Sequence, residues 1–398
     1  IRSTSGNNTL SGLITLAAHT YIQSDDDTLT LDVSTGSAIT GSYNFYSEGA
    51  GNITVSDPIA IGSGNIFKND AGTLTLTGTN TFTGFTVVNG GILSINQDRA
   101  LGAVPGSTDA DNIILNGSTL KTTASFTINT KRGIELRANS FINVDSSTTL
   151  TYAGIIKRQN SENNGYTKSG TGTLALSGDS TYTGTTIISA GVITIAHAGS
   201  LGSTSGATSI TSGAALSISG GITVAEPITV NGTGVSSGGA IVFTGGNNTY
   251  SGAITLGATS TIISSSGAQT ISATVNGGQA LTITANGNLV ISGAVGGSTD
   301  LSSYAVTTTN SSSQTFSANV ETTGNQTYTA AGGIVTSGAI TFDSSGGTVN
   351  FASALSGNNN VTVTGNADID GAITDIAVLS ISGTSNIGAD ITTSGTQT

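Results

Sequence analysis

The stretch GTLTLTGTNTFTGFTVVNGGILSI, from Gly72 to Ile95, returns one hundred residues later as GTLALSGDSTYTGTTIISAGVITI, from Gly172 to Ile195. In both copies apolar residues alternate with Thr, Ser or Ala, as in TLTL and TLAL, and Gly, Asn or Ser follows every few residues. Alternation with a period of two is typical of short β-strands that bury one face. The two copies therefore predict a repeated unit made of strands and turns.

Other phrases recur at other distances. NNTLSGLITL from Asn7 returns as NNTYSGAITL from Asn247, and ITVSDPIAI from Ile53 returns as ITVAEPITV from Ile222. Repeated strand–turn units without helix signals predict a solenoid, in which each coil stacks on the one before it. A propeller needs an even period of about 40–50 residues, and the spacings here are irregular.

The fold predicted from these patterns is all-β: a right-handed parallel β-helix, or β-solenoid, forming a single elongated rod. Coils of roughly 20–25 residues fit the spacing of the strand signals. Five pairs of residues that tolerate positive φ are expected at the turns. They are Asn89-Gly90, Asn116-Gly117, Asn231-Gly232, Asn276-Gly277 and Asp370-Gly371.

The composition excludes several classes of function. Only 8% of the 398 residues are charged, against roughly 25% in an average soluble protein. All ten Lys and Arg residues lie between Arg2 and Lys168, and no basic cluster suits nucleic acid or an anionic membrane surface. There is no Cys, which rules out disulfides and thiolate chemistry. No apolar run of about eighteen residues is present, so no membrane insertion is expected in this segment.

The chain is expected to be a piece of a longer protein. It begins with Ile1 and contains no Met. It stops at GTQT, the opening of a phrase seen in full as AQTISATV from Ala268 and SQTFSANV from Ser313. The parent sequence is therefore expected to continue with Tyr, Phe or Ile and then a further repeat.

The quoted phrases resemble a known family. TKSGTGTLALSGDSTYTGTTIISAGVITI (167–195), with LGS at 201 and EPITVNG at 226, is similar to the passenger-associated repeat of autotransporter proteins. The resemblance covers residues 1–256 as two copies, about 72–171 and 172–256, and a partial copy, 1–71. Residues 257–398 resemble the looser strand repeats of filamentous-haemagglutinin-like surface proteins and are expected to continue the β-helix.

This resemblance implies export across a Gram-negative outer membrane, through a C-terminal β-barrel or a separate partner pore, to the bacterial cell surface or beyond. The implied function is a non-enzymatic structural and adhesive module, a stiff, protease-resistant stalk of a surface protein or extracellular fibre. The alternative is a glycan-binding or polysaccharide-degrading passenger domain. End-to-end or lateral self-association and host or matrix glycans are the expected partners.

Two groups of carboxylates are the only candidates for catalysis or loose Ca²⁺ binding, because glycoside cleavage needs paired carboxyl groups and Ca²⁺ prefers oxygen ligands. The first group is Asp25, Asp26 and Asp27 with Asp32; the second is Asp368, Asp370 and Asp375. The prediction for both is a solvated turn. We therefore expect no catalytic residue, no metal site and no cofactor.

A first candidate for recognition is the aromatic segment SYNFYSEG (42–49). It contains Tyr43, Phe45 and Tyr46 in a chain that is only 5% aromatic. These side chains have three possible roles: they stack on sugar rings, fill a wide end of the coil, or pack against another subunit.

A second candidate is the charged segment 156–168, which contains Lys157, Arg158, Tyr166 and Lys168. It is predicted to protrude from the rod, as a binding loop or as a tolerated insertion.

Overall fold

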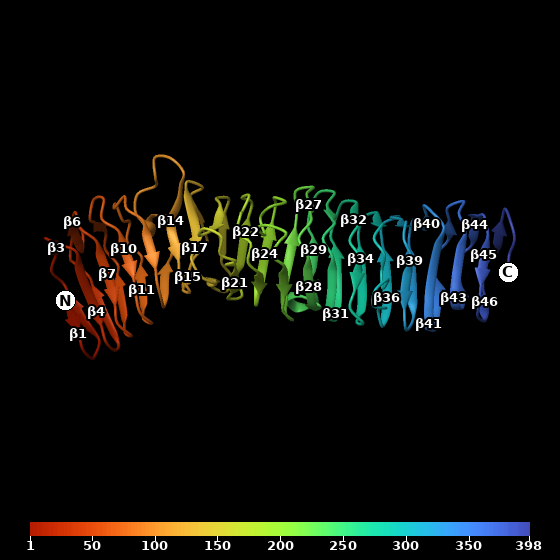
Figure 1. Cartoon of the computed structure of the whole chain (residues 1–398), viewed down its shortest axis with the longest axis horizontal. Helices are drawn as coiled ribbons and strands as arrows, with labels where there is room; N and C mark the ends of the chain where they lie inside the picture. The colour runs from red at the N-terminus through yellow and green to blue at the C-terminus, as the bar shows by residue number, and fades with distance from the viewer. The chain divides into compact units, whose positions relative to one another are not determined.

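The computed structural model describes all residues, 1–398. It contains β-strands β1 to β47 and two short 3-10 turns, η1 (Asp98–Leu101) and η2 (Val235–Ser237). No helix is long and apolar enough to cross a membrane. Strands of successive coils pair in parallel, as Figure 1 shows, and the coils form a β-solenoid of about 18 turns. The predicted parallel β-solenoid is confirmed, while its handedness and its rod shape stay predictions.

The chain divides into two compact units, and each is described by itself. Unit 1 comprises residues 1–193 and 199–206, and unit 2 comprises residues 194–198 and 207–398. The predicted repeat boundaries at 71, 171 and 256 concern sequence repeats and stay predictions.

One face of unit 1 is an eight-stranded parallel sheet, called sheet A below. Its strands, in spatial order, are β1 (Arg2–Ser3), β4 (Thr20–Ser24), β7 (Phe45–Glu48), β10 (Ile66–Lys68), β12 (Thr86–Val88), β14 (Asp109–Leu115), β17 (Arg132–Leu136) and β20 (Ile156–Arg158).

The other strands of unit 1 pair from coil to coil in the same way. They are β2 (Asn8–Leu10), β3 (Ile14–Leu16), β5 (Thr28–Leu31), β6 (Ile39–Gly41), β8 (Asn52–Val55), β9 (Ile59–Ala60), β11 (Thr73–Leu76), β13 (Ile92–Ile95), β15 (Thr119–Thr122), β16 (Phe126–Ile128), β18 (Ser140–Val144), β19 (Thr149–Tyr152), β21 (Tyr166–Ser169), β22 (Thr173–Leu176) and β23 (Thr186–Ile188).

Strand β24 (Gly191–Ile195) contributes residues to both units, and unit 2 holds the rest. One of its sheets has nine strands: β27 (Thr223–Val224), β30 (Thr249–Tyr250), β32 (Gln269–Ile271), β35 (Leu289–Ile291), β37 (Gln314–Phe316), β40 (Ile334–Thr336), β42 (Leu355–Ser356), β44 (Ile373–Ile376) and β47 (Ile391–Thr393). The remaining strands are β25 (Thr208–Ile210), β26 (Ala214–Ile218), β28 (Ile228–Gly232), β29 (Ile241–Phe243), β31 (Ile254–Ser264), β33 (Val275–Asn276), β34 (Ala280–Ala285), β36 (Ser303–Thr308), β38 (Val320–Thr322), β39 (Gln326–Ala330), β41 (Ile340–Phe351), β43 (Val361–Ile369), β45 (Leu379–Ile381) and β46 (Ser385–Ile387).

The length of a coil varies more than the sequence pattern suggested. Partner residues are 21 apart where Arg2 pairs with Gln23, 27 apart where Val88 pairs with Leu115, and 18 apart where Val361 pairs with Leu379. The expected range of roughly 20–25 residues is therefore too narrow. Extra residues leave the coil as loops at the corners, because the strands must keep their register for the backbone hydrogen bonds to form.

The interior is filled by columns of aliphatic side chains, one residue per coil. A column in unit 1 runs through Leu29, Ile53, Leu74, Leu93, Leu120 and Ile142, all of them buried. Their alternating neighbours, such as Thr73 and Thr75, are partly exposed. The alternation that predicted these strands is confirmed, and each fully buried Leu or Ile stabilises the fold by about 1.5–3 kcal/mol.

Two buried lysines, Lys68 and Lys168, each lie four residues before a copy of the repeated stretch. The Lys168 ammonium donates to the carbonyl oxygens of Ser169 (3.1 Å), Gly170 (2.7 Å) and Ala190 (2.9 Å). Lys68 likewise donates to the carbonyls of Asn69 and Asp70. Burial lowers the pKa of each lysine to about 8. These side chains supply donors to corner carbonyls that the strand ladder leaves unpaired.

Buried glutamines act as interior donors in the later QT phrases. Gln269, Gln314 and Gln326 are fully buried. Their amide nitrogens donate to carbonyl oxygens, for example Gln314 to that of Thr329 at 2.7 Å and Gln326 to that of Asp343 at 2.6 Å. The Q of each phrase is therefore an interior donor and not a solvated turn residue.

On the outside of the coils, asparagine side-chain oxygens accept hydrogen bonds from backbone N–H groups of the next coil. Examples are Asn52 with Thr73 (3.0 Å) and Asn247 with Ala268 (2.9 Å). The predicted role of Asn-Gly pairs in turns is confirmed at Gly117 and Gly277, which have positive φ. Gly232 also has positive φ but is the last residue of β28, at a register shift in the strand pairing. At Asn89-Gly90 the positive φ belongs to the following residue, Gly91. At Asp370-Gly371 it belongs to neither residue.

Gly72, the first residue of the repeated stretch, lies where two coils come too close for a side chain. A Cβ atom at this position would lie 1.9 Å from the carbonyl oxygen of Gly51 in the preceding coil. Gly91, one coil further on, would bring a Cβ atom to 2.2 Å from the carbonyl oxygen of Gly72. Glycine is therefore required here by packing between backbones.

Replacing this glycine should destabilise unit 1. The substitution Gly72→Ala is expected to lower the free energy of unfolding by about 1–3 kcal/mol, because the coils must move apart to admit the methyl group. Gly106→Ala is the matched control, since a Cβ atom there meets nothing within 4 Å. Urea unfolding followed by circular dichroism measures both, and equal midpoints for the two variants would contradict the close approach at Gly72.

Glu226, between β27 and β28, is a buried carboxyl group whose two oxygens have no hydrogen-bond partner. The hydroxyl of Tyr250 donates instead to the main-chain oxygen of Glu226, at 2.8 Å. Burial raises the pKa of this carboxyl from 4.5 to about 8. At neutral pH the folded chain therefore holds a proton that the unfolded chain releases.

Because the folded chain holds this proton, the effect of Glu226→Gln on stability should depend on pH. Between about pH 4.5 and pH 8 the unfolded state ionises while the folded state does not, so wild-type stability falls as pH rises through this range. The Gln variant lacks this loss. Its unfolding temperature should match that of the wild type near pH 4 and exceed it increasingly up to pH 8. A difference that stays constant with pH would overturn this assignment.

Candidate recognition face

Three aromatic rings stack on the outer side of sheet A, one from each of three successive strands. Tyr21 of β4 pairs in register with Tyr46 of β7, and Tyr46 with Phe67 of β10. The ring centroids of Tyr21 and Tyr46 are 4.5 Å apart with planes at 20°, and those of Tyr46 and Phe67 are 4.6 Å apart with planes at 7°. We call these three residues the aromatic ladder.

Other aromatic side chains surround the ladder. Phe85, just before β12, meets Phe67 edge to face, with centroids 5.9 Å apart. Tyr43 makes a similar contact with His19 at 5.6 Å. Tyr21, Tyr43 and Phe85 are exposed. Five of the chain's aromatic residues thus lie together on one face, and such gatherings of exposed apolar side chains mark interaction surfaces.

A column of amide groups runs beside the ladder on the same face. Asn69 donates to a carboxylate oxygen of Glu48 (3.2 Å), Asn89 to the side-chain oxygen of Asn69 (2.9 Å), and Asn116 to that of Asn89 (3.4 Å). Each contact joins side chains of neighbouring coils, so the column is a chain of hydrogen bonds directed along the stack.

A second polar column lies on the other side of the ladder. The side-chain oxygen of Asn44 accepts the backbone N–H of Asn65, and that of Asn65 accepts the N–H of Phe85, both at 3.0 Å. His19 Nδ1 accepts the N–H of Asn44 at 3.1 Å. We call the ladder with its surrounding aromatic residues and both polar columns the aromatic face.

The column of the ladder continues through Val87 and Ile114 to Glu135 and Lys157 in register on β12, β14, β17 and β20. Glu135 accepts from Lys157 and from Arg137, each at 2.8 Å. Burial opposes ionisation of Glu135, but the hydrogen bonds from Lys157 and Arg137 outweigh it, so its pKa is lowered.

The structure separates the seven residues predicted for recognition. Tyr43 and Tyr46 lie on the aromatic face, and Lys157 lies in the same sheet further along the stack. Arg158 donates to the main-chain oxygen of Glu162 at 3.3 Å. Three predicted residues face the interior and form no part of an exposed patch: Phe45, Tyr166 and Lys168. Ligand contacts of the other four stay a prediction.

Sequence reasoning missed Tyr21, Phe67 and Phe85. They lie outside the aromatic segment 42–49, and no short-range pattern in the sequence links them. Tyr21, Tyr46 and Phe67 are separated by 25 and 21 residues, which are the offsets between paired strands here. An alignment of the coils in register could have found the ladder.

Three of the candidate carboxylates contact other side chains. Asp25 forms an ion pair with Arg2 at 2.7 Å. Asp368 and Asp370 accept hydrogen bonds from Asn350, both at 3.0 Å. No group of three or more His, Cys, Asp or Glu side chains is placed to hold a metal ion.

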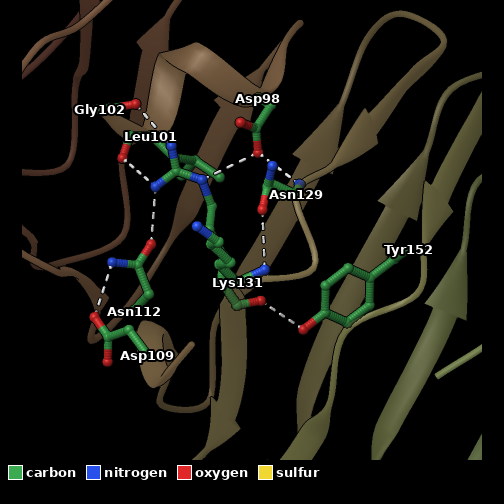
Figure 2. A network of polar contacts seen from close by, with 9 residues as sticks. Asp98, Leu101, Gly102, Asp109, Asn112, Asn129, Lys131 and Tyr152 are labelled. Carbon is green, nitrogen blue, oxygen red and sulfur yellow. Dashed lines mark hydrogen bonds and ion pairs between the residues drawn. The ribbon is translucent and has the colours of Figure 1, made fainter. Parts of the chain in front are cut away.

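Sequence analysis also missed a polar network around Arg132, which is fully buried (Figure 2). Its guanidinium donates to Asp98 (3.0 Å), Asn112 (2.9 Å) and the carbonyls of Leu101 (2.9 Å) and Gly102 (2.7 Å). A buried guanidinium needs a partner for each of its five N–H donors. The structure provides hydrogen bonds for four of them.

The Arg132 network fixes the start and end of an irregular loop, residues 103–108. The loop leaves the stack just before β14, in orange in Figure 1. Lys131 binds its middle by donating to the carbonyl oxygen of Gly106 at 2.7 Å. In the segment 156–168, which was predicted to protrude, only the turn between β20 and β21 is exposed; both ends are strands.

Comparisons with known proteins identify the repeats in this solenoid. Residues 66–95 and 167–195 match the family model of the passenger-associated-transport repeat. They contain the interior donors Lys68 and Lys168, the close-packed Gly72, and Gly172, where a Cβ atom would lie 2.2 Å from the carbonyl oxygen of Asp145. These two stretches therefore match the passenger-associated repeat that the sequence resemblance indicated.

A segment of 144 residues is 39% identical to the "Adhesin BmaC autotransporter" of Brucella suis biovar 1 (strain 1330). The match covers 36% of this chain and 4% of that relative, so the chain spans a very small part of its length. No solved structure matches the chain significantly.

Proposed function

We propose that the chain is a segment of an exported bacterial surface adhesin and acts as a non-enzymatic stalk that also carries a recognition surface. The observation that supports this most is the aromatic face, displayed on a regular parallel stack whose matched repeats are those of autotransporter passengers. Adhesion, cell-surface location and partners are inferred from this combination.

Stiffness follows from how the coils are joined. Each strand is hydrogen-bonded to the strand before and after it, and each interior side chain packs on its counterparts in the next coils. Bending a unit would break backbone bonds on one side and open the aliphatic columns on the other. Such a stack suits a stalk that holds a binding surface away from the cell.

Protease resistance is expected because cleavage requires a segment of backbone to leave its ladder and enter a protease. Residues 169–398 also contain no Lys or Arg, so trypsin has no site there. The exposed loops 103–108 and 160–163 are the places where a less selective protease should cut.

Recognition is assigned to the aromatic face, and host or matrix glycans or proteins are the partner classes that suit an adhesin. Glycan binding is the alternative role for this face. Polysaccharide cleavage has less support, because Asp25, Asp368 and Asp370 are engaged by neighbouring side chains. Self-association remains part of the proposal through lateral contact of these faces.

Two measurements on the purified chain test this proposal. Proteinase K should cut first within loops 103–108 and 160–163 and leave the coils intact, as mass spectrometry of the fragments would show. Beads coated with the folded chain should bind extracellular matrix several-fold better than beads coated with heat-unfolded chain. Rapid digestion throughout the coils, or equal binding by both bead preparations, would contradict the proposed role.

A further inference from the structure

The aromatic ladder exposes the edges of its rings. Tyr21 covers one face of the Tyr46 ring and Phe67 covers the other, with centroids 4.5 and 4.6 Å away. The exposed part of Tyr46 is therefore its rim. Sugar rings stack on aromatic faces, so a glycan cannot stack on the central ring of this ladder.

Ring edges attract a different kind of partner. The rim of an aromatic ring carries partial positive charge and its faces carry negative charge, which makes edge-to-face contact favourable. A row of rims is therefore complementary to the electron-rich face of another aromatic ring. A flat molecule lying along the ladder would meet the rims of Tyr21, Tyr46 and Phe67 in turn.

The two polar columns give the ladder the shape of a track. Tyr21, Tyr46, Phe67 and Phe85 come from four successive coils, so with strands about 4.8 Å apart the track is roughly 15 Å long. Hydrogen bonds within the columns of Asn44 and Asn69 hold both borders in place. The track therefore suits an elongated ligand that lies along the stack.

The charges beside the track favour a cation. Between His19 and Asn89 the three columns contain one carboxylate, Glu48, and no Lys or Arg. Arg2, at the end of the column of Glu48, is paired with Asp25 at 2.7 Å. The chain as a whole has a net charge of −12, which attracts cations over longer distances.

We propose that the aromatic face binds flat, elongated, cationic aromatic molecules along the ladder. This inference rests on the proposed recognition role of the face and names a class of ligand for it. The ligand places an electron-rich ring on the partially positive rims and its positive charge, carried at its other end, towards Glu48.

Thioflavin T, a flat aromatic cation whose fluorescence rises when its rings are held coplanar, is a direct probe. Titration of the folded chain at low salt should give a saturable rise in fluorescence. The double variant Tyr46→Thr/Phe67→Thr removes two rims and should weaken binding about tenfold. Threonine keeps a side chain that suits a strand. Glu48→Gln should weaken binding by about twofold to fivefold.

Phe141→Thr is the matched control, because Phe141 is an exposed aromatic side chain of β18 outside the aromatic face. It should bind the dye as the wild type does. Unfolding temperatures of all variants establish that the coils remain folded. Wild-type affinity in the double variant, no saturable signal from the wild type, or displacement of the dye by cellohexaose would each overturn the proposal; the last result would indicate a glycan site.

Beads coated with the double variant distinguish a failure of this ligand proposal from a failure of the proposed adhesive function. Undiminished matrix binding with lost dye binding would keep the adhesive role and remove the aromatic face from it. Loss of both is expected if the face performs the recognition.

Discussion

Backbone hydrogen bonds between parallel strands of successive coils are the interaction on which the other features depend. They hold each residue above its counterpart in the preceding coil, so Leu74 lies on Ile53 and Tyr46 lies against Phe67. At the corners of the coils the strand-to-strand hydrogen bonds stop, so the backbone N–H and C=O groups there need other partners. Buried lysines and glutamines supply donors from inside, and asparagines supply acceptors from outside. The repeated residue types of this sequence follow from these positions.

The same register turns single surface residues into continuous columns. A coil can present one aromatic ring at a given position, and neighbouring coils then add a second and a third at the spacing of the strands. The aromatic ladder therefore has both a regular spacing and a fixed orientation of its rings. That orientation distinguishes a ladder from a set of isolated aromatic side chains, since it covers the ring faces and leaves the rims for a partner.

The strand pattern of this fold is readable from the sequence because alternation such as TLTL depends only on adjacent residues. The surface columns are not, because strand partners on neighbouring coils lie 27 residues apart in one place and 18 in another, and the loops that absorb the difference carry no fixed signal. Lys168 illustrates a second difficulty. Its charge suggested a surface loop, whereas its partners are carbonyl oxygens, which every residue possesses. Arg132 was missed for the same reason, since half of its contacts are to the backbone.

Cysteine pairs test the register most directly, because the natural chain contains no Cys. Thr54 and Thr75 are partners on neighbouring coils, and paired parallel strands lie about 4.8 Å apart, within the range that a disulfide can bridge. The double variant Thr54→Cys/Thr75→Cys should therefore oxidise readily without loss of folded structure. The pair Thr54→Cys/Thr77→Cys, displaced by two residues, should not. Equal oxidation of the two pairs, or preferential oxidation of the displaced pair, would contradict the stacking of these coils in register.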